Sequence, residues 1–155
     1  MKKQGFTLIE LMVVIVIMGI LAAVAVPKLF GMIAKSKASE VPTAAGTWIN
    51  MQDAYFQEAQ RVGTWPEIGY SAAGTVKSNG SKYESKVITY SGAASTGWVA
   101  TPIAKLNECG DSGEKWALSA STAGSPLDVS ISDNGTSKDC LDLTPSFTNL
   151  QKNNS

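Results

Sequence analysis

Histidine is absent from the 155-residue sequence, and charged side chains make up only 17% of it. Without histidine, the chain lacks the commonest general base and the commonest metal ligand, and a Ser-His-Asp triad is impossible. The 13 basic and 13 acidic residues balance to a formal charge of zero, which gives no support to a nucleic-acid binder that works by bulk electrostatics. No phosphate-cradling glycine motif occurs either. These absences argue against an enzyme, and we expect neither a cofactor nor a nucleic-acid partner.

Cysteine is also scarce, with one residue at position 109 and one at position 140. Two cysteines are too few for a zinc site built from four cysteines, but they can form one disulfide. In the chain-entropy model, closing a loop of roughly 30 residues contributes about 3–4 kcal/mol to stability. Outside the cytoplasm, we therefore expect a disulfide between Cys109 and Cys140.

Apolar residues are concentrated near the start of the sequence. Between positions 6 and 26, every residue is apolar except Thr7, Glu10 and Gly19, whereas the rest of the sequence mixes apolar with polar residues. A helix of about 21 residues spans roughly 31 Å, about the thickness of the hydrocarbon core of a bilayer. Lys2 and Lys3 precede this run, and because positive charge is retained on the cytoplasmic side, the residues after 26 should face outward. A cleaved secretory signal is the alternative, although the run is longer than the usual signal-peptide core.

A single carboxylate, that of Glu10, lies at the leading end of the apolar run. A carboxylate at the centre of a bilayer costs about 2.5–3.5 kcal/mol or more, and somewhat less near the interface, so a cationic partner is expected. No lysine or arginine occurs between Lys3 and Lys28. A cut after Gly5 would create such a cation, the α-amino group of Phe6, in the same chain or in a neighbouring one.

The residues around this carboxylate carry a resemblance to a known family. Residues 2–14 read KKQGFTLIELMVV and residues 19–27 read GILAAVAVP, which resembles the N-terminal signature of type IV pilins and pseudopilins. The resemblance implies that a prepilin peptidase cuts between Gly5 and Phe6 and methylates the Phe6 amine. It also implies that Glu10 assists processing and assembly, by pairing with the N-terminal amine of a neighbouring subunit. The match is close as far as Pro27 and loose from there to about position 60.

Four segments are expected, in an α+β fold of the pilin type. Residues 1–5 would be a cleaved leader, 6–26 a transmembrane and polymerisation helix, 27–62 the continuation of that helix, and 63–155 a globular head. Pro27 should end or kink the apolar helix, because proline lacks an N–H and its ring clashes one turn back. The second half of the long helix is expected to pack on a small antiparallel sheet in the head.

Periodicity gives further detail for the second half of the chain. Pro42 suits the first turn of a fresh helix, and Gly63 is expected to end it. Polar residues such as Gln52 are placed on the exposed side of this helix. Its apolar face is predicted from steps of three and four residues, at Ala44, Trp48, Met51, Tyr55, Ala59 and Val62. Strands are predicted at residues 82–90, 97–104, 114–121 and 127–132, with a loop at 64–80 and a loose tail from 144.

The resemblance implies a function that is structural, not enzymatic. It implies a subunit of a type IV pilus, or fimbrium, that serves adhesion, motility or DNA uptake. The expected partners are copies of the chain in a helical filament, the prepilin peptidase and the inner-membrane assembly machinery. The chain would cross the bacterial inner membrane once, with its head outside the cytoplasm, and would become extracellular in the pilus.

Two alternatives stay open within the same superfamily. The chain could be a pseudopilin of a type II secretion system, or a minor pilin that acts as a binding module. Major pseudopilins bind calcium near their C-terminal end, which makes Asp128 and Asp133 calcium candidates. Their spacing does not match an EF-hand loop, and acidic loop residues are usually just solvated, so no metal site is assigned.

Overall fold

The computed structural model of the protein describes residues 5–78, 82–92, 97–111, 113–122, 127–132 and 135–151. The chain forms two compact units, Met1–Ile33 and Ala34–Ser155, and each is considered by itself below. Two helices come first, α1 (Leu8–Ala38) and α2 (Glu40–Ala59). The strands follow as β1 (Thr75–Lys77), β2 (Lys82–Glu84), β3 (Ile88–Ser91), β4 (Gly97–Pro102), β5 (Trp116–Ser121) and β6 (Asp128–Ile131). The described part of the chain ends with α3 (Lys138–Leu143) and the 3-10 helix η1 (Pro145–Leu150).

The first unit consists mainly of the N-terminal part of α1, which is apolar on every side. Its large apolar side chains are all exposed, from 88% for Phe6 to 41% for Ile33. By length and composition, the helical stretch Leu8–Ala59 contains a segment that is able to cross a membrane. A helix that is apolar all round needs to be covered by lipid or by protein.

Pro27 lies inside α1, which continues to Ala38. The prediction that the helix could end at Pro27 is therefore wrong. Proline removes only one backbone donor, and the helix continues because the residues on either side of it keep their helical hydrogen bonds. The interruption comes instead at Ser39. The N–H and the hydroxyl of Ser39 both donate to the carbonyl oxygen of Ser36, at 3.4 and 2.7 Å. A fresh helix, α2, then begins at Glu40 with Pro42 in its first turn, as predicted.

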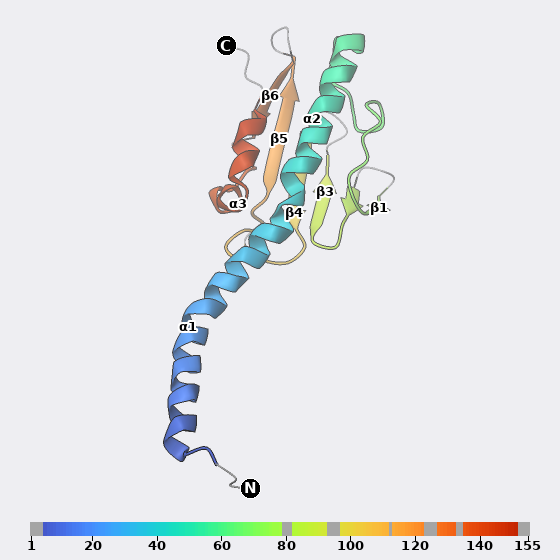
Figure 1. The fold of residues 1–155 in the computed structure, drawn as a ribbon. Coiled ribbons are helices and arrows are strands. Elements are labelled where there is room, and N and C mark those ends of the chain that lie inside the picture. Colours follow the sequence, from blue (N-terminus) through green and yellow to red (C-terminus); the bar gives the residue numbers. More distant parts are fainter. Residues whose placement is uncertain are drawn as a thin grey trace. The chain divides into compact units, whose positions relative to one another are not determined.

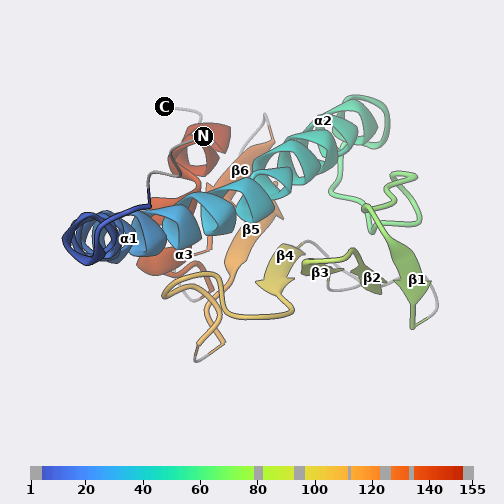
Figure 2. The ribbon, with the colours of Figure 1, turned by 60° about the horizontal axis from the view of Figure 1, so that its bottom comes forward.

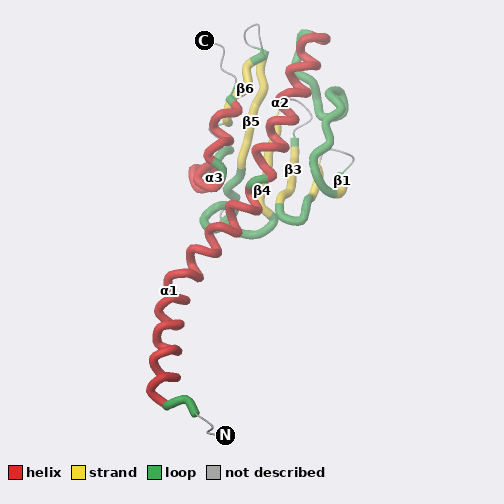
Figure 3. The backbone as a smooth tube through the Cα atoms, viewed as in Figure 1, coloured by secondary structure: helices red, strands yellow, loops and turns green. Residues whose placement is uncertain are grey.

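The second unit contains a six-stranded sheet, in which each strand pairs antiparallel with the next along the chain (Figure 3). The α+β class with an antiparallel sheet is thereby confirmed. Residues 82–90, predicted as one strand, instead form the β2–β3 hairpin. The hairpin turns at Ser85, whose N–H donates to the Ile88 carbonyl at 2.8 Å and whose hydroxyl accepts from the N–H of Val87 and of Ile88. Strand β1 lies in the segment predicted as a loop.

Helix α2 crosses one face of this sheet, as Figures 1 and 2 show. The predicted apolar face is displaced, because Trp48 is the one member of the predicted set that is buried. The buried positions of α2 are Val41, Ala45, Trp48, Ile49, Gln52 and Phe56. Helix α2 also ends before Gly63, because Gln60 adopts the left-handed conformation (φ 54°) and its N–H closes the last turn on Phe56 at 2.9 Å.

Gln52, which the periodicity places on the exposed side of the helix, is fully buried. Its side-chain amide donates to the carbonyl oxygen of Gly63 at 2.7 Å, and the N–H of Gly63 donates back to Oε1 at 3.1 Å. The Gln52 side chain therefore satisfies both backbone groups of Gly63, a buried residue in the loop after α2. A buried backbone group left without a partner costs about 1–3 kcal/mol, which explains why a polar side chain occupies this position.

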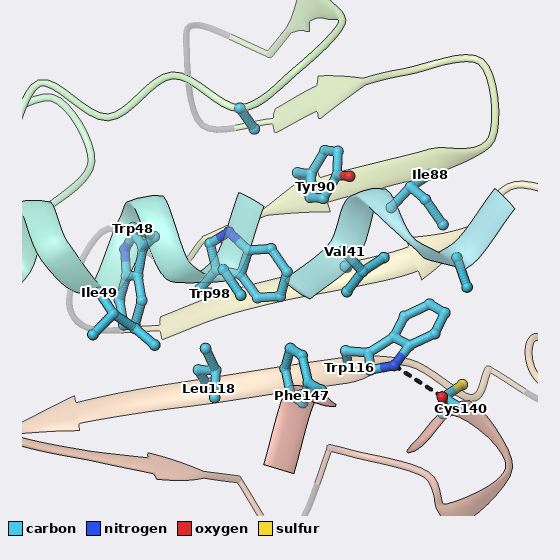
Figure 4. Packing of buried hydrophobic residues seen from close by; sticks show 14 of the residues in the cluster. Val41, Trp48, Ile49, Ile88, Tyr90, Trp98, Trp116, Leu118, Cys140 and Phe147 are labelled. Atoms are coloured by element: carbon cyan, nitrogen blue, oxygen red, sulfur yellow. Dashed lines mark hydrogen bonds between the residues drawn. The ribbon is translucent and has the colours of Figure 1, made fainter. Parts of the chain in front are cut away.

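The C-terminal part of the chain also contributes to the core. Cys109 and Cys140 form a disulfide with a Cα–Cα distance of 4.8 Å. The indole N–H of Trp116 donates to the Cys140 carbonyl at 3.0 Å, and Figure 4 shows this bond beside the buried Trp98 and Phe147. The prediction of a loose segment from residue 144 is wrong, because η1 is ordered by Phe147, which is fully buried with its ring centroid 6.1 Å from that of Trp98.

Candidate assembly site at the start of helix α1

Thr7 and Glu10 form a capping box at the beginning of α1. The backbone N–H and the hydroxyl of Thr7 donate to Glu10 Oε2, at 2.8 and 2.7 Å. In return, the Glu10 N–H donates to the Thr7 hydroxyl oxygen at 3.4 Å. Such reciprocal bonds satisfy backbone donors that the first turn of a helix leaves free. The geometry explains why α1 begins at Leu8, immediately after Thr7.

Sequence reasoning seeks a cation for Glu10 and misses Thr7 as its partner. The signal is present, since Thr7 precedes Glu10 by three residues and stands directly before an apolar run, which is the spacing of a capping box. A carboxylate in the first turn is also favoured by the helix dipole. Glu10 is therefore partly accommodated within its own chain.

The Glu10 carboxylate keeps one oxygen available. Oε2 accepts both bonds from Thr7, whereas Oε1 accepts no hydrogen bond from a residue that the structure describes. Two hydrogen bonds to one oxygen hold the carboxylate in a fixed direction at the end of the helix. A cation that approaches Oε1 would not have to displace Thr7.

The peptide bond between Gly5 and Phe6 lies just before α1, in backbone without regular structure. Both residues are exposed, and nothing lies within 4 Å of the position that a side chain on Gly5 would occupy. Residues 1–4, the rest of the predicted leader, lie outside the described residues. The described geometry leaves this peptide bond open to another protein.

The calcium candidates are only partly covered by the structure. Asp128 opens β6, and its Oδ1 atom is buried without a hydrogen-bond partner among the described residues. Asp133 lies outside the described residues. Within the described ranges, no three acidic, histidine or cysteine side chains gather closely enough to hold a metal ion.

Comparison with known proteins gives a family match at this end of the chain and several similar proteins. Residues 1–26 match the family described as the prokaryotic N-terminal methylation motif. The chain is 42% identical over 71 residues to the type IV major pilin protein PilA of Myxococcus xanthus, which covers 45% of this chain and 32% of that protein. It is 39% identical over 103 residues to the fimbrial protein EcpC of Eikenella corrodens, covering 66% of this chain and 63% of that protein.

A third relative gives a similar match. The type IV major pilin protein PilE1 of Neisseria gonorrhoeae is 44% identical over 71 residues, which is 45% of this chain and 41% of that protein. The chain thus matches between about a third and just under two thirds of the length of these relatives.

Three features together define a pilin-like α+β protein. They are the methylation motif, the exposed apolar helix α1 and the antiparallel sheet whose face α2 crosses. Within that class, the relatives are named type IV major pilins and fimbrial proteins. The chain is therefore similar to type IV pilins in its N-terminal motif and in these partial matches.

Proposed function

We propose that this chain is a structural subunit of a type IV pilus, made as a precursor that loses residues 1–5 and polymerises through the apolar part of α1. The observation that carries the proposal is the exposure of every large apolar side chain from Phe6 to Ile33. Burying one such side chain stabilises by about 1.5–3 kcal/mol. A helix with this surface suits lipid before assembly and copies of itself afterwards.

Processing fits the exposed, non-helical backbone at Gly5 and Phe6. A prepilin peptidase would hydrolyse the Gly5–Phe6 bond and leave a free α-amino group on Phe6, which would then be N-methylated. The match of residues 1–26 to the prokaryotic N-terminal methylation motif supports this step. The new cation stands one residue before Thr7, whose N–H already donates to Glu10. Cleavage therefore places a positive charge beside a capped carboxylate.

Pairing between copies follows from the state of the Glu10 carboxylate. An ionised carboxylate that leaves water needs a counter-charge, because its desolvation costs several kcal/mol. The Oε1 atom of Glu10 is available for the Phe6 amine of a neighbouring copy, while Thr7 keeps Oε2 occupied. The role of Thr7 is to orient the carboxylate, and the role of Glu10 is to select a correctly processed neighbour.

Close approach of the helices is supported by small residues within the apolar run. Small side chains let helix backbones come near each other in lipid or in a protein bundle. In α1 these residues are Gly19, Ala22, Ala23 and Ala25. The subunit would cross the inner membrane once and move into the extracellular filament with the help of the assembly machinery.

Mechanical shearing of cells, followed by electron microscopy and quantitative proteomics of the pelleted filaments, tests this proposal. We expect the chain to be the bulk component of the filaments. A trace amount in filaments built from another subunit would indicate a minor pilin. Absence from all sheared filaments would overturn the proposal and favour a pseudopilin of a secretion system.

A further inference from the structure

A groove lies beside α2 in the second unit, between the first turns of this helix and residues 70–73. We call it the α2 groove, and its volume is about 490 Å³. Its lining joins one carboxylate, that of Glu40, to several hydroxyl groups and to the methyl groups of Ala44 and Ala73. The groove therefore offers polar and apolar contacts together, as small-molecule sites do.

The carboxylate of Glu40 is held in a fixed direction by β3 and by the turn before it. Its Oε1 atom accepts a hydrogen bond from the hydroxyl of Ser85 at 2.7 Å and another from the hydroxyl of Tyr90 at 2.8 Å. Its Oε2 atom accepts none from the residues that the structure describes, and no described lysine or arginine forms an ion pair with Glu40. One oxygen of this half-buried carboxylate is thus left for a ligand.

Two hydroxyl groups of the lining have used their protons within the chain. Ser39 donates to the Ser36 carbonyl oxygen at 2.7 Å, and Thr47 donates to the Thr43 carbonyl oxygen at 3.0 Å. A hydroxyl has one proton but two lone pairs, so these groups can still accept a hydrogen bond from a ligand but cannot donate one to it. The groove therefore presents mainly hydrogen-bond acceptors and a negative charge.

The lining argues against three other classes of ligand. An anion would be repelled by Glu40, and no described lysine or arginine lines the groove. A sugar would need donors for its hydroxyl oxygens, whereas Tyr70 already donates to the Ala44 carbonyl at 3.1 Å and is only 3% exposed. A metal ion needs several ligands, and no three acidic, histidine or cysteine side chains gather in the described ranges. The class that fits is an organic cation that donates hydrogen bonds.

We propose that the α2 groove binds a small primary amine with a short alkyl stem. Its ammonium would donate to Oε2 of Glu40 in a charge-assisted hydrogen bond. Thr43 lies three residues further along α2, on the same face of the helix, and its hydroxyl oxygen can accept a second bond. The alkyl stem would cover the methyl groups of Ala44 and Ala73, which removes apolar surface from water. This site is separate from the apolar part of α1, so the inference goes beyond the proposed function.

An NMR titration of the full chain in nonionic detergent tests the site, with n-butylamine as the probe. This amine is protonated at neutral pH, and we expect saturable binding to one site per chain. As controls, 1-butanol has the same stem without the charge, and tetramethylammonium has the charge without an N–H donor. Both should bind about tenfold or more weakly than n-butylamine, because neither can form the charge-assisted hydrogen bond to Glu40.

A charge-neutral variant tests the carboxylate. Glu40→Gln keeps an oxygen that can accept from Ser85 and Tyr90, so the fold is retained, but an amide N–H donor replaces Oε2. We expect this variant to bind n-butylamine about tenfold or more weakly than the wild-type chain. The matched control is Glu58→Gln, which removes an exposed carboxylate elsewhere on α2 and should leave the affinity unchanged.

A filling variant tests the apolar part of the groove. Ala44→Leu would occupy the space of the alkyl stem, while the backbone carbonyl that accepts from Tyr70 stays in place. It should weaken the binding of n-butylamine about tenfold, although the charge of Glu40 is kept. Ala54→Leu adds the same bulk at an exposed position of α2 and should bind as the wild-type chain does. Urea unfolding of each variant checks that it is folded.

The outcomes decide the proposal without reference to filaments, because the titration uses the unassembled chain. Failure of n-butylamine to saturate a site on the wild-type chain would overturn it. So would equal affinities of the wild-type and Glu40→Gln chains, or 1-butanol binding as tightly as n-butylamine. If Glu40→Gln does not fold, equal affinities of Ala44→Leu and Ala54→Leu would overturn it as well, whereas weaker binding to Ala44→Leu alone would support it.

Discussion

The substitution Glu10→Gln separates the two roles that the structure gives to this carboxylate. A glutamine at this position of a capping box still accepts from the Thr7 N–H, so α1 should begin at the same residue. What the variant loses is the negative charge. Because the start of the helix is preserved, a defect in assembly can be assigned to charge pairing between subunits.

The size of the effect follows from the expected geometry. Opposite unit charges about 4 Å apart attract with about 4 kcal/mol at an effective dielectric constant of about 20. That energy corresponds to roughly a thousandfold change in the affinity of one subunit for the next. We therefore expect Glu10→Gln to be present at normal levels in the membrane fraction and to give few or no pelleted filaments.

The assay compares the membrane-bound and the sheared, pelleted amounts of the chain by immunoblot, with electron microscopy of the pellet. Thr7→Ser serves as a matched control, because serine keeps the hydroxyl that caps the helix, and it should assemble normally. Abundant filaments from Glu10→Gln would refute pairing of this carboxylate with a neighbouring amine. Loss of the protein from the membrane fraction would show instead that Glu10 is needed before assembly.

Three other substitutions test separate parts of the molecule. Gly5→Val should block processing, because a branched side chain would occupy space that is open beside the scissile bond; a mature N-terminus at Phe6, seen by mass spectrometry, would contradict the assigned cut. Gln52→Leu should lower the free energy of unfolding by about 1–3 kcal/mol for each of the two Gly63 backbone groups that lose a partner. Urea unfolding of the full chain in detergent measures this loss, and exposed Gln57→Leu should leave the midpoint unchanged. Glu67→Gln should remove an acid-dependent part of the stability. The Arg61 guanidinium, which donates to Glu67 at 2.7 Å, and the Thr64 N–H and hydroxyl lower the pKa of that carboxyl to about 2. The stabilisation is complete above pH 4.5, the ordinary value for the unfolded chain, and is lost as the pH falls towards 2. The difference between wild type and Glu67→Gln should shrink over that window, and a constant difference would contradict the assignment.

The parts of the fold that sequence reasoning predicts correctly are those with a local cause. The apolar run produces α1, and Pro42 in the first turn of α2 reflects its fixed backbone angle. Short runs that mix β-branched or aromatic residues with polar ones, bounded by turn residues, locate β4, β5 and β6, although their ends differ by one or two positions.

The parts that are predicted wrongly depend on contacts between distant residues. Nothing local shows that Gln52 must turn inward, because its partners are the backbone groups of Gly63, eleven positions further along the chain. The same holds for Phe147, whose burial beside Trp98 orders a segment that reads as a tail. The Glu40 network joins residues 45 and 50 positions apart, which no periodicity can reveal.

At the candidate site, the residues can be found from sequence, but their geometry cannot. Gly5, Phe6 and Glu10 stand out because of a recognisable motif and a carboxylate in an apolar run. The capping bond from Thr7 to Glu10 follows an equally local rule, and it is missed when a cation is sought instead of a hydroxyl.

Helical reconstruction of the sheared filaments by electron cryo-microscopy measures the central claim most directly. We expect the α1 helices of neighbouring copies to pack around the filament axis, each starting at Phe6, with the Phe6 amine of one copy within ion-pair distance of Glu10 in the next. Filaments whose subunits contact each other only through the Ala34–Ser155 unit, or whose Glu10 has no neighbouring amine, would contradict it.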